Sequence, residues 1–531
     1  MSAVAANGDA SAASAEWQPR TNPWLIALSV MTATFMVVLD TSIASVALPY
    51  IAGNLGATRD ESTWVLTSYL VSNAIVLPAS AWFSLFFGRK RFLLVCIVIF
   101  TLASVVCGIS TSIEMLIIAR VLQGAGGGAM QPISQAIMLE SFPPAKRGAA
   151  MAMFGVGVVI APIVGPTLGG WLTTTYSWRW AFYINLPVGV IAVFLISFLV
   201  EDPPYIRNAR PGRIDSIGFG LMALWLGTLQ ITLDKGQEAD WFAAVWLRWL
   251  VLISSLSMIG FIVRELITIH PIVDLRILKN RNFAVGCGLY AMFGAALYAL
   301  IALQPLFLQT LLGYTALDAG LTVSPRGLGS IVALFLVGAL VERVNPRLLI
   351  AFGFLSFGVS SYWLSRMNLD VSMSSRLPAN ILNGFGSGFV FVPLITVAMG
   401  TLKNEQMGNA TGIQNLLRNI GGSIGLSYVS TMLERYAQAH QALMVGHLTP
   451  LNPIYVHQLG SVQRIFESHF SPPDALHRAE AFLYNLLLQQ ADYWSFVDLF
   501  YLVAWLCLGC ALGTLFFKSV KPARTAAAAE M

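Results

Sequence analysis

The chain has 531 residues, of which 56% are hydrophobic and 11% are charged, and its formal net charge is +5. Soluble domains carry about 25% charged residues, so this composition excludes an ordinary soluble protein and indicates a chain solvated by lipid. The basic excess does not indicate nucleic-acid binding, because most Lys and Arg residues fall in alternate segments between apolar runs. This positive-inside bias predicts a multi-pass inner (plasma) membrane protein with both termini in the cytoplasm.

Apolar segments of about 20 residues recur along nearly the whole chain and predict fourteen transmembrane helices. The predicted spans lie near residues 24–49, 64–86, 92–111, 113–139, 150–172, 181–200, 215–233, 243–264, 283–309, 320–341, 347–366, 376–400, 409–432 and 497–517. Lipid cannot satisfy open backbone groups, and nothing in the sequence alternates like a barrel strand. The fold class is therefore an all-α membrane protein.

The N-terminal stretch 1–23 is rich in Ala and Ser and is predicted to be a disordered cytoplasmic segment. It is not read as a cleavable signal, because the apolar run that follows is too long and contains Asp40. The other predicted units are an N-terminal six-helix half at 24–200, two inserted transmembrane helices with linkers at 201–282, a C-terminal six-helix half at 283–517 with a periplasmic loop at 433–496, and a cytoplasmic tail at 518–531.

An internal duplication relates the two halves. ARVLQGAGGGAMQP (119–132) and ANILNGFGSGFVFVP (379–393) align at one spacing of 260 residues (384 − 124). This spacing pairs Gly124, Gly126, Gly128, Gly148 and Gly165 with Gly384, Gly386, Gly388, Gly408 and Gly425, Gln123 with Asn383, and Arg120 with Asn380. Two related six-helix halves are typical of secondary transporters that alternate between inward-open and outward-open states.

Three stretches place polar or helix-breaking residues inside predicted spans: LDTSIASVALP (39–49), LIIARVLQGAGGG (116–128) and GVGVVIAPIVGPTLGGW (155–171). In this order they resemble the motifs of the 14-span drug:proton antiporters of the major facilitator superfamily. SWRWAFYINLPVG (177–189) and GIQNLLRNIGGSIGLS (412–427) are similar to the EmrB type of multidrug efflux permease. The resemblance implies the major facilitator fold and export of hydrophobic or amphipathic drugs.

The resemblance also implies a transporter rather than an enzyme, driven by the proton gradient with no cofactor. The sequence agrees, because no GxxxxGK[ST] phosphate-binding loop and no metal-ligand set occur in a plausible frame. Two alternatives remain: an exporter of an endogenous metabolite such as a siderophore, fatty acid or amino acid, and a membrane sensor that does not transport.

Asp40 and Arg120 are the candidates for proton coupling. An ionisable residue inside a span costs at least about 2.5 kcal/mol and is a functional candidate for that reason. Asp40 would take up and release the proton, and the resemblance implies that Arg120 modulates this carboxylate. The other reading is structural: Asp40 pairs with a neighbouring helix and Arg120 ties two helices together.

The segment 155–171 reads as a kinked, closely packed helix, because small residues recur every four positions and two prolines follow the same spacing. The residues assigned to this antiporter motif and to gating are Gly157, Pro162, Gly165, Pro166, Gly169 and Gly170. We expect the segment to pack on a helix of the opposite half near the outer side. Large residues at Gly165 or Gly169 should block transport without preventing insertion.

Two cytoplasmic loops are candidates for a charged latch. In this family the first such loop usually carries an acid, but AWFSLFFGRKR (81–91) has Leu85 at that position. The second loop, GALVERVNPR (338–347), has an acidic residue, Glu342. The latch residues are Arg89, Lys90, Arg91, Glu342, Arg343 and Arg347. We expect the second loop to carry more of the gating.

A polyspecific cavity needs large adaptable apolar walls and few polar anchors. The candidate cavity residues are Gln123, Tyr290, Phe293, Tyr298, Asn383, Asn415 and Arg418. For Arg418 two roles are open, contact with a substrate or counter-ion and structural pairing. Arg326 is expected to be structural, and Asp498 is expected to lie at the membrane interface.

The outer loop 433–496 contains five of the six histidines, at spacings unlike a metal site. Its apolar residues around 476–487 predict an amphipathic helix. This loop either folds down as a cap or docks a periplasmic partner. The EmrB resemblance favours a partner, namely a membrane-fusion adaptor that leads to an outer-membrane channel.

Overall fold

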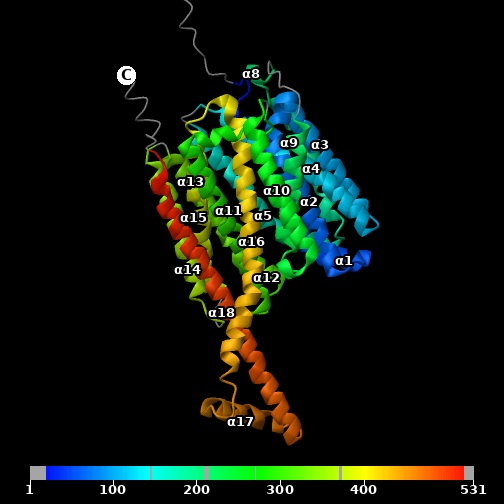
Figure 1. Ribbon diagram of the computed structural model, residues 1–531, viewed down its shortest axis with the longest axis vertical. Helices are drawn as coiled ribbons and strands as arrows, with labels where there is room; N and C mark the ends of the chain where they lie inside the picture. The colour runs from blue at the N-terminus through cyan, green and yellow to red at the C-terminus, as the bar shows by residue number, and fades with distance from the viewer. Residues whose placement is uncertain are drawn as a thin grey trace, which may run out of the picture.

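The computed structural model describes residues 19–143, 146–207, 215–269, 271–341, 343–369 and 373–518, and these ranges contain helices but no β-strand (Figure 1). The expected disordered N-terminus and cytoplasmic tail therefore lie almost entirely outside the described residues. The rest forms a bundle of long helices with one extension at its far end (Figure 1).

The described part of the N-terminal half contains seven helices. They are α1 (Pro23–Leu55), α2 (Arg59–Phe87), α3 (Arg89–Ile109), α4 (Ile113–Ser141), α5 (Arg147–Thr175), α6 (Trp180–Tyr183) and α7 (Asn185–Leu199). Local sequence sets their ends. The Asn22 side chain accepts from the Trp24 amide to begin α1, and Gly56 ends it in the left-handed region at φ +65°. Thr58 and Glu61 form a capping box that begins α2 earlier than the apolar run predicts.

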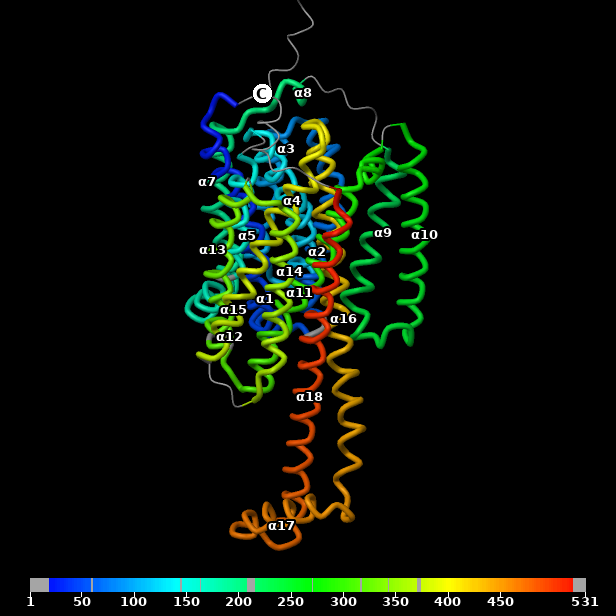
Figure 2. The backbone as a smooth tube through the Cα atoms, turned by 90° about the vertical axis from the view of Figure 1, so that its left-hand side faces the viewer, coloured from blue at the N-terminus to red at the C-terminus, as the bar shows by residue number. Residues whose placement is uncertain are grey.

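The inserted segment forms an antiparallel pair, α9 (Ser216–Lys235) and α10 (Val245–Ile267), preceded by the short α8 (Pro204–Arg207). Short 3-10 turns, η2 (Trp241–Ala243) and η3 (Leu275–Lys279), flank α10. The pair lies beside the main bundle, with α9 on the inner side (Figure 2). The α9 helix packs against α2 and α16.

The C-terminal half begins with α11 (Arg281–Thr310), α12 (Ala316–Val323), α13 (Pro325–Leu340), α14 (Pro346–Ser365), α15 (Met373–Met399) and η4 (Asn404–Gln406). It continues with α16 (Met407–Val445), α17 (Pro453–Glu467), α18 (Pro472–Gly513) and η5 (Thr514–Phe516). The single span predicted at 320–341 is two helices, because Pro325 has no amide hydrogen and begins a new helix.

The predicted outer loop is mostly helical. The α16 helix has 39 residues and α18 has 42, so each extends for roughly 60 Å, about twice the thickness of a bilayer core. Their far ends project from the bundle as a hairpin with α17 across its tip (Figures 1 and 2). We call this extension the hairpin. Because it points away from the bundle, the alternative of a cap folded down over the transporter is wrong for this structure.

Twelve helices of the described part are long and apolar enough to cross a membrane, which does not confirm the predicted count of fourteen. The two predicted spans that are missing lie in α4 and α16, which are long helices but carry many glycines and polar side chains. Most of α4 is buried among other helices, so protein rather than lipid surrounds its polar groups.

The glycines of the duplication have the same role in both halves. A methyl group on Gly124 would collide with the Tyr69 carbonyl of α2, and one on Gly384 would collide with the Arg326 carbonyl of α13. Close approach of α2 to α4 and of α13 to α15 therefore depends on glycine at these positions.

Candidate functional site

Asp40 and Arg120 form an ion pair in the N-terminal half, and neither side chain is exposed. Arg120 Nη1 donates to Asp40 Oδ2 at 2.6 Å. The other carboxylate oxygen accepts from Gln123 Nε2 at 2.8 Å and from Asn185 Nδ2 at 2.7 Å. Asn185, the first residue of α7, was not among the predicted site residues, although it lies in the YINLPVG stretch that supports the family resemblance.

The other contacts of Arg120 also stay within this half. Its Nε donates to the Val65 carbonyl at 3.0 Å, and its guanidinium lies 4.1 Å from the centre of the Tyr69 ring. Asp40 and Arg120 are not among the residues that line the large cavity of the structure. The pair therefore connects α1, α4 and α7 behind the cavity wall.

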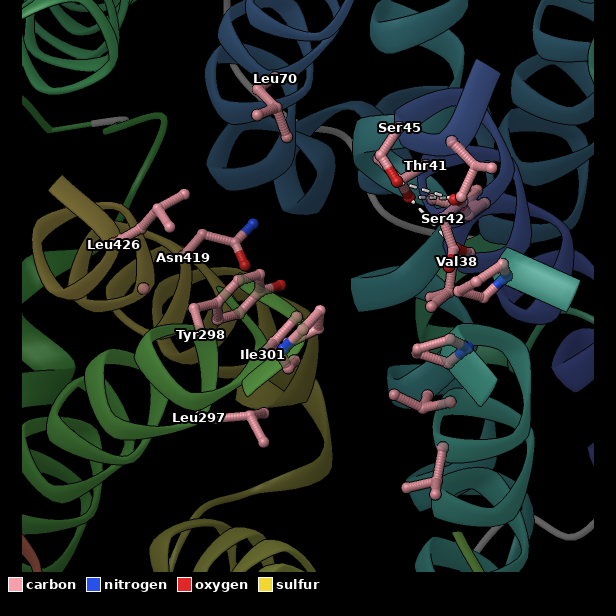
Figure 3. Close-up of a pocket in the computed structure, with 18 of the residues that line it drawn as sticks. Val38, Thr41, Ser42, Ser45, Leu70, Leu297, Tyr298, Ile301, Asn419 and Leu426 are labelled. Atoms are coloured by element: carbon pink, nitrogen blue, oxygen red, sulfur yellow. Dashed lines mark hydrogen bonds between the residues drawn. The ribbon is translucent and has the colours of Figure 1, made fainter. Parts of the chain in front are cut away.

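A cavity of about 1570 Å³ lies between the two halves. Its walls come from α1, α2, α4 and α5 of one half, from α11, α12, α13, α15 and α16 of the other, and from the inserted α9. Side chains of α1, including Val38, Ser42 and Ser45, face Tyr298 and Asn419 of the opposite half across open space (Figure 3). The cavity is therefore shared between the halves.

The cavity wall is largely apolar, with hydroxyl and amide groups distributed over it. Among the described residues its charged members are Asp234, Arg326 and Arg418. Of the predicted cavity residues, Phe293, Tyr298 and Arg418 line the wall. The remaining four, Gln123, Tyr290, Asn383 and Asn415, do not line it.

These four lie behind the wall and bind other side chains. Gln123 bonds Asp40, and the Tyr290 hydroxyl lies 3.4 Å from Arg418 Nη1. Asn383 Oδ1 accepts from Arg326 Nε at 2.7 Å, and Asn415 Nδ2 donates to Gln135 Oε1 of the opposite half at 2.6 Å.

The antiporter segment lies in α5, where its two faces have different neighbours. Pro162, Pro166 and Gly170 line the cavity. The face that carries Gly157, Gly165 and Gly169 packs on α1, against Met31, Ser42 and Ile43. This small-residue face therefore packs on α1 of the same half, whereas the contacts of α5 with the opposite half are made to α12, α13 and α15.

One contact of α5 with the opposite half lies near the beginning of α5. A methyl group on Gly148 would collide with Val341, and one on Gly155 would crowd Leu334 of α13. We call this end of the bundle the terminal end, because α1 begins and α18 finishes there (Figure 2). Arg147 Nη2 also donates to Asn404 Oδ1 across the halves at 2.9 Å. The two halves are thus in contact at the terminal end.

At the opposite end the cavity reaches the ends of several helices. The cavity wall includes Tyr50 near the end of α1, Thr174 near the end of α5 and Gln309 near the end of α11. Tyr50 and Trp171 are 45% and 52% exposed. The cavity therefore extends to the end from which the hairpin projects.

The first latch loop has acidic partners that its own sequence lacks. Arg89 is buried and forms an ion pair with Glu140 at the end of α4. The Lys90 amide donates to Asp202 Oδ1 at 2.9 Å. Arg91 has no described ion pair. In the sequence, Glu140 directly follows the predicted span 113–139. An acidic residue at the end of a span is the sequence signal that could have predicted this contact with the latch loop.

In the second latch loop, Glu342 lies outside the described residues. Arg343 and Arg347 are in none of the ion pairs found among the described residues. The Arg347 amide donates to Asn345 Oδ1 at the start of α14.

At the other end of the bundle, His440 Nε2 lies 2.8 Å from Asp498 Oδ2, and this contact joins α16 to α18.

Comparison with known proteins agrees with this architecture. Residues 30–426 match the family model for the Major Facilitator Superfamily. The chain is 37% identical to the multidrug export protein EmrB of Escherichia coli K12 over 432 residues, covering 81% of this chain and 84% of that protein. It is 36% identical to the fatty acid resistance protein FarB of Neisseria gonorrhoeae over 425 residues, covering 80% and 83%.

A crystal structure of a double-tryptophan mutant of XylE has a TM-score of 0.58 and 14% identity, and the match covers 93% of this chain and 99% of that one. That likeness shows the fold. The sequence relatives show more, because they align over most of both chains. The protein is a transporter rather than an enzyme, and it belongs to the major facilitator superfamily as an EmrB-type multidrug efflux permease.

Proposed function

We propose that this protein is a proton-coupled antiporter that exports hydrophobic or amphipathic drugs across the inner membrane by alternating access. The observation that carries the proposal is the cavity of about 1570 Å³ between the two halves. A cavity of this size holds a drug-sized molecule, and rocking of one half against the other would expose it to each side in turn.

The positive-inside bias supports placing the terminal end in the cytoplasm. The structure would then be the outward-open state, with the hairpin in the periplasm. All fourteen predicted spans cross the membrane in this proposal. The glycine-rich α4 and the polar α16 cross inside the bundle, where their side chains meet protein or the cavity rather than lipid.

For proton coupling we propose Asp40, with Arg120 as the group that responds to its charge. Protonation of Asp40 would remove the attraction that holds Arg120 and would weaken a contact shared by α1, α4 and α7. Those helices also carry the cavity wall or support it. The energy source is the proton gradient, and no cofactor is required.

The hairpin supports the proposal of a tripartite system with a periplasmic membrane-fusion adaptor and an outer-membrane channel. It extends beyond the bundle, and its tip exposes apolar side chains: Leu451 is 92% exposed, Ile454 73% and Ile465 68%. Exposed apolar groups in a protruding segment are typical of a protein-binding surface.

A reconstituted system tests the proposed activity. Protein in proteoliposomes with an imposed pH gradient should drive uptake of a hydrophobic fluorescent dye and release protons in exchange. The Asp40→Asn protein should bind the dye but lose the dependence on the gradient. If dye uptake by the unmodified protein does not depend on the pH gradient, the transport is not proton-coupled.

Export of an endogenous compound is a second candidate, and its specific support is the similarity to a fatty acid resistance protein. Susceptibility of cells with and without the gene, compared for a drug panel and for long-chain fatty acids, separates the two cargoes. A sensor that does not transport would give no flux in the reconstituted assay for either class.

A further inference from the structure

One face of α4 carries a polar stripe that leads away from Asp40. The stripe begins at Gln123, which binds Asp40, and continues at every fourth position with Gly127, Gln131 and Gln135. Residues four apart lie on one face of a helix, so these positions form a continuous row about 18 Å long. The row runs toward the terminal end, because Phe142 directly after α4 packs on Trp24 at the start of α1, with ring centres 5.0 Å apart.

A tyrosine of α2 supplies the polar group at the one position of the stripe that has no side chain. The Tyr69 hydroxyl lies 2.9 Å from the place that a Cβ on Gly127 would occupy. The ring of the same tyrosine lies 4.1 Å from the Arg120 guanidinium, which is bound to Asp40. Polar groups therefore follow one another from the Asp40 ion pair to Gln135.

Both glutamines in the lower part of the stripe bind α16 of the opposite half. Arg418 Nη2 donates to Gln131 Oε1 at 3.1 Å, and Asn415 Nδ2 donates to Gln135 Oε1 at 2.6 Å. Gln135 and Asn415 are 1% and 0% exposed. A guanidinium beside a polar path also repels protons, so the contact with α16 closes the stripe in this structure.

The contact between α4 and α16 contains further buried polar groups. Ser134 precedes Gln135, Gln414 precedes Asn415, and Ser134 and Gln414 are both 0% exposed. The Ser134 hydroxyl, both amide atoms of Gln414 and the Asn415 amide oxygen have no hydrogen-bond partner among the described residues. An unpaired buried polar group costs about 1–3 kcal/mol, and ordered water is its usual partner. This contact is therefore suited to hold water.

The second half has no such stripe. The positions 260 residues after Gly127, Gln131 and Gln135 are Ser387, Phe391 and Ile395. Phe391 packs on α5 of the opposite half, where a Cβ on Gly155 would lie 3.4 Å from its ring. Apolar side chains are thus enough to pack the halves at this depth. The polar version occurs in the half that contains Asp40.

We infer that Gln131 and Gln135 line the route by which Asp40 releases its proton to the cytoplasm, and that α16 gates this route. Protonated Asp40 would give its proton to water held along the stripe, each water would pass one proton to the next, and one proton would enter the cytoplasm. Asp40 would return to the carboxylate that pairs with Arg120. This inference rests on the proposed antiport and adds the path of the proton to it.

The gate follows from the two bonds that cross the halves. In the proposed outward-open state, Arg418 and Asn415 cover the stripe and keep Asp40 separate from the cytoplasm. Separation of the halves at the terminal end would withdraw both side chains together with α16 and open the stripe. Asp40 would then never be connected to both sides of the membrane at once, which prevents a proton leak.

Two transport assays in proteoliposomes separate a proton route from a structural role. Gln135→Leu should lower dye uptake driven by a pH gradient about tenfold, because it removes a buried polar group from the route. Exchange of dye across the membrane at equal pH needs only the dye-loaded transporter, and it should change by less than about twofold. Gln135→Glu keeps an acceptor for Asn415 and for water, and it should retain most of the gradient-driven uptake.

The matched control is Thr396→Val on α15, which removes a hydroxyl next to the counterpart of Gln135 in the second half. The Thr396 hydroxyl donates to the Val392 carbonyl of its own helix, so both assays should be unchanged in this variant. Equal losses of uptake and exchange in Gln135→Leu would assign Gln135 a packing role and contradict the inference. Unimpaired uptake in this variant would contradict it as well.

A leak assay tests the gate. With no dye present, Arg418→Ala and Asn415→Ala should each let an imposed pH gradient collapse about tenfold faster than the unmodified protein does, and Thr396→Val should not. Leak rates equal to that of the unmodified protein would show that α16 does not gate the route. If dye uptake by the unmodified protein is coupled to the gradient but Gln135→Leu behaves normally, only the route is removed. Uncoupled uptake by the unmodified protein would remove the antiport and the route together.

Discussion

Asp40 and Arg120 lie 2.6 Å apart between Oδ2 and Nη1, 80 residues apart in sequence, and neither side chain is exposed. Two amide groups complete the coordination of the carboxylate. A buried pair of this kind does not by itself imply net stabilisation, but removal of one partner leaves an uncompensated charge. The relationship can therefore be tested by comparing single and double substitutions.

Arg120→Gln should destabilise the protein by about 3–5 kcal/mol, because it leaves Asp40 charged and buried. The double variant Asp40→Asn with Arg120→Gln should recover most of that loss, since no unpaired charge remains. Both should lack transport driven by a proton gradient. Thermal unfolding in detergent and flux in proteoliposomes measure the two effects. A double variant as unstable as Arg120→Gln would show that the charge is not the cause.

Gly165→Leu should give a protein that inserts in the membrane but does not transport. Any side chain at Gly165 meets the Ser42 side chain of α1, so the two helices would have to separate. Overpacking of this kind costs about 1–3 kcal/mol. The control is Gly220→Leu on α9, where nothing lies within 4 Å of an added Cβ. Normal drug export by the Gly165→Leu protein, with membrane levels checked by immunoblot, would contradict this role for the α1–α5 contact.

A disulfide across the halves should hold the terminal end closed. A Cβ placed on Gly338 of α13 would lie 3.5 Å from the Cβ of Ala152 on α5, which is within the range of disulfides. The double variant Ala152→Cys with Gly338→Cys should therefore lose transport on oxidation and recover it on reduction. Each single variant is the control. Full transport with the disulfide formed, as verified by mass spectrometry, would show that this contact does not need to open.

Glu140→Gln in the first latch should have a larger effect on thermal stability and transport kinetics than Glu342→Gln in the second latch. Arg89 and Glu140 are 2% and 3% exposed, so Glu140→Gln leaves a buried arginine unpaired and should cost about 3–5 kcal/mol. Thermal unfolding and transport kinetics of the two variants make the comparison. A larger kinetic effect from Glu342→Gln would instead favour the second loop as the main latch.

The course of the chain could largely be predicted from its apolar runs, because lipid requires helices of a known minimum length. The directions in which the side chains point could not be predicted in this way. The α1 helix is apolar on nearly all sides, so its sequence does not indicate whether Asp40 faces the cavity or the helices behind it. Its partner Asn185 and the latch partner Glu140 come from distant segments. Only the packing of the helices brings these groups together.

The duplication predicted corresponding positions but not corresponding environments. Arg326 has no arginine at its counterpart position, Leu66, so the repeat did not single it out. Its exposure to the cavity follows from the break between α12 and α13 at Pro325, which begins a new helix one residue before it. The predicted structural role of Arg326 thus took no account of the cavity that the assembled helices create.

Shortening the hairpin should abolish efflux from whole cells but preserve transport in proteoliposomes. Residues 444–481 would be replaced by a short Gly-Ser linker. The linker can close the remaining helices, because Gln441 Nε2 lies 2.7 Å from the Tyr484 hydroxyl. The contact between His440 and Asp498 is retained, so the bundle should keep its stability. The tip exposes apolar side chains and lies away from the cavity, and its removal should therefore affect docking rather than flux. Loss of transport in both assays would instead assign the hairpin a role within the transporter itself.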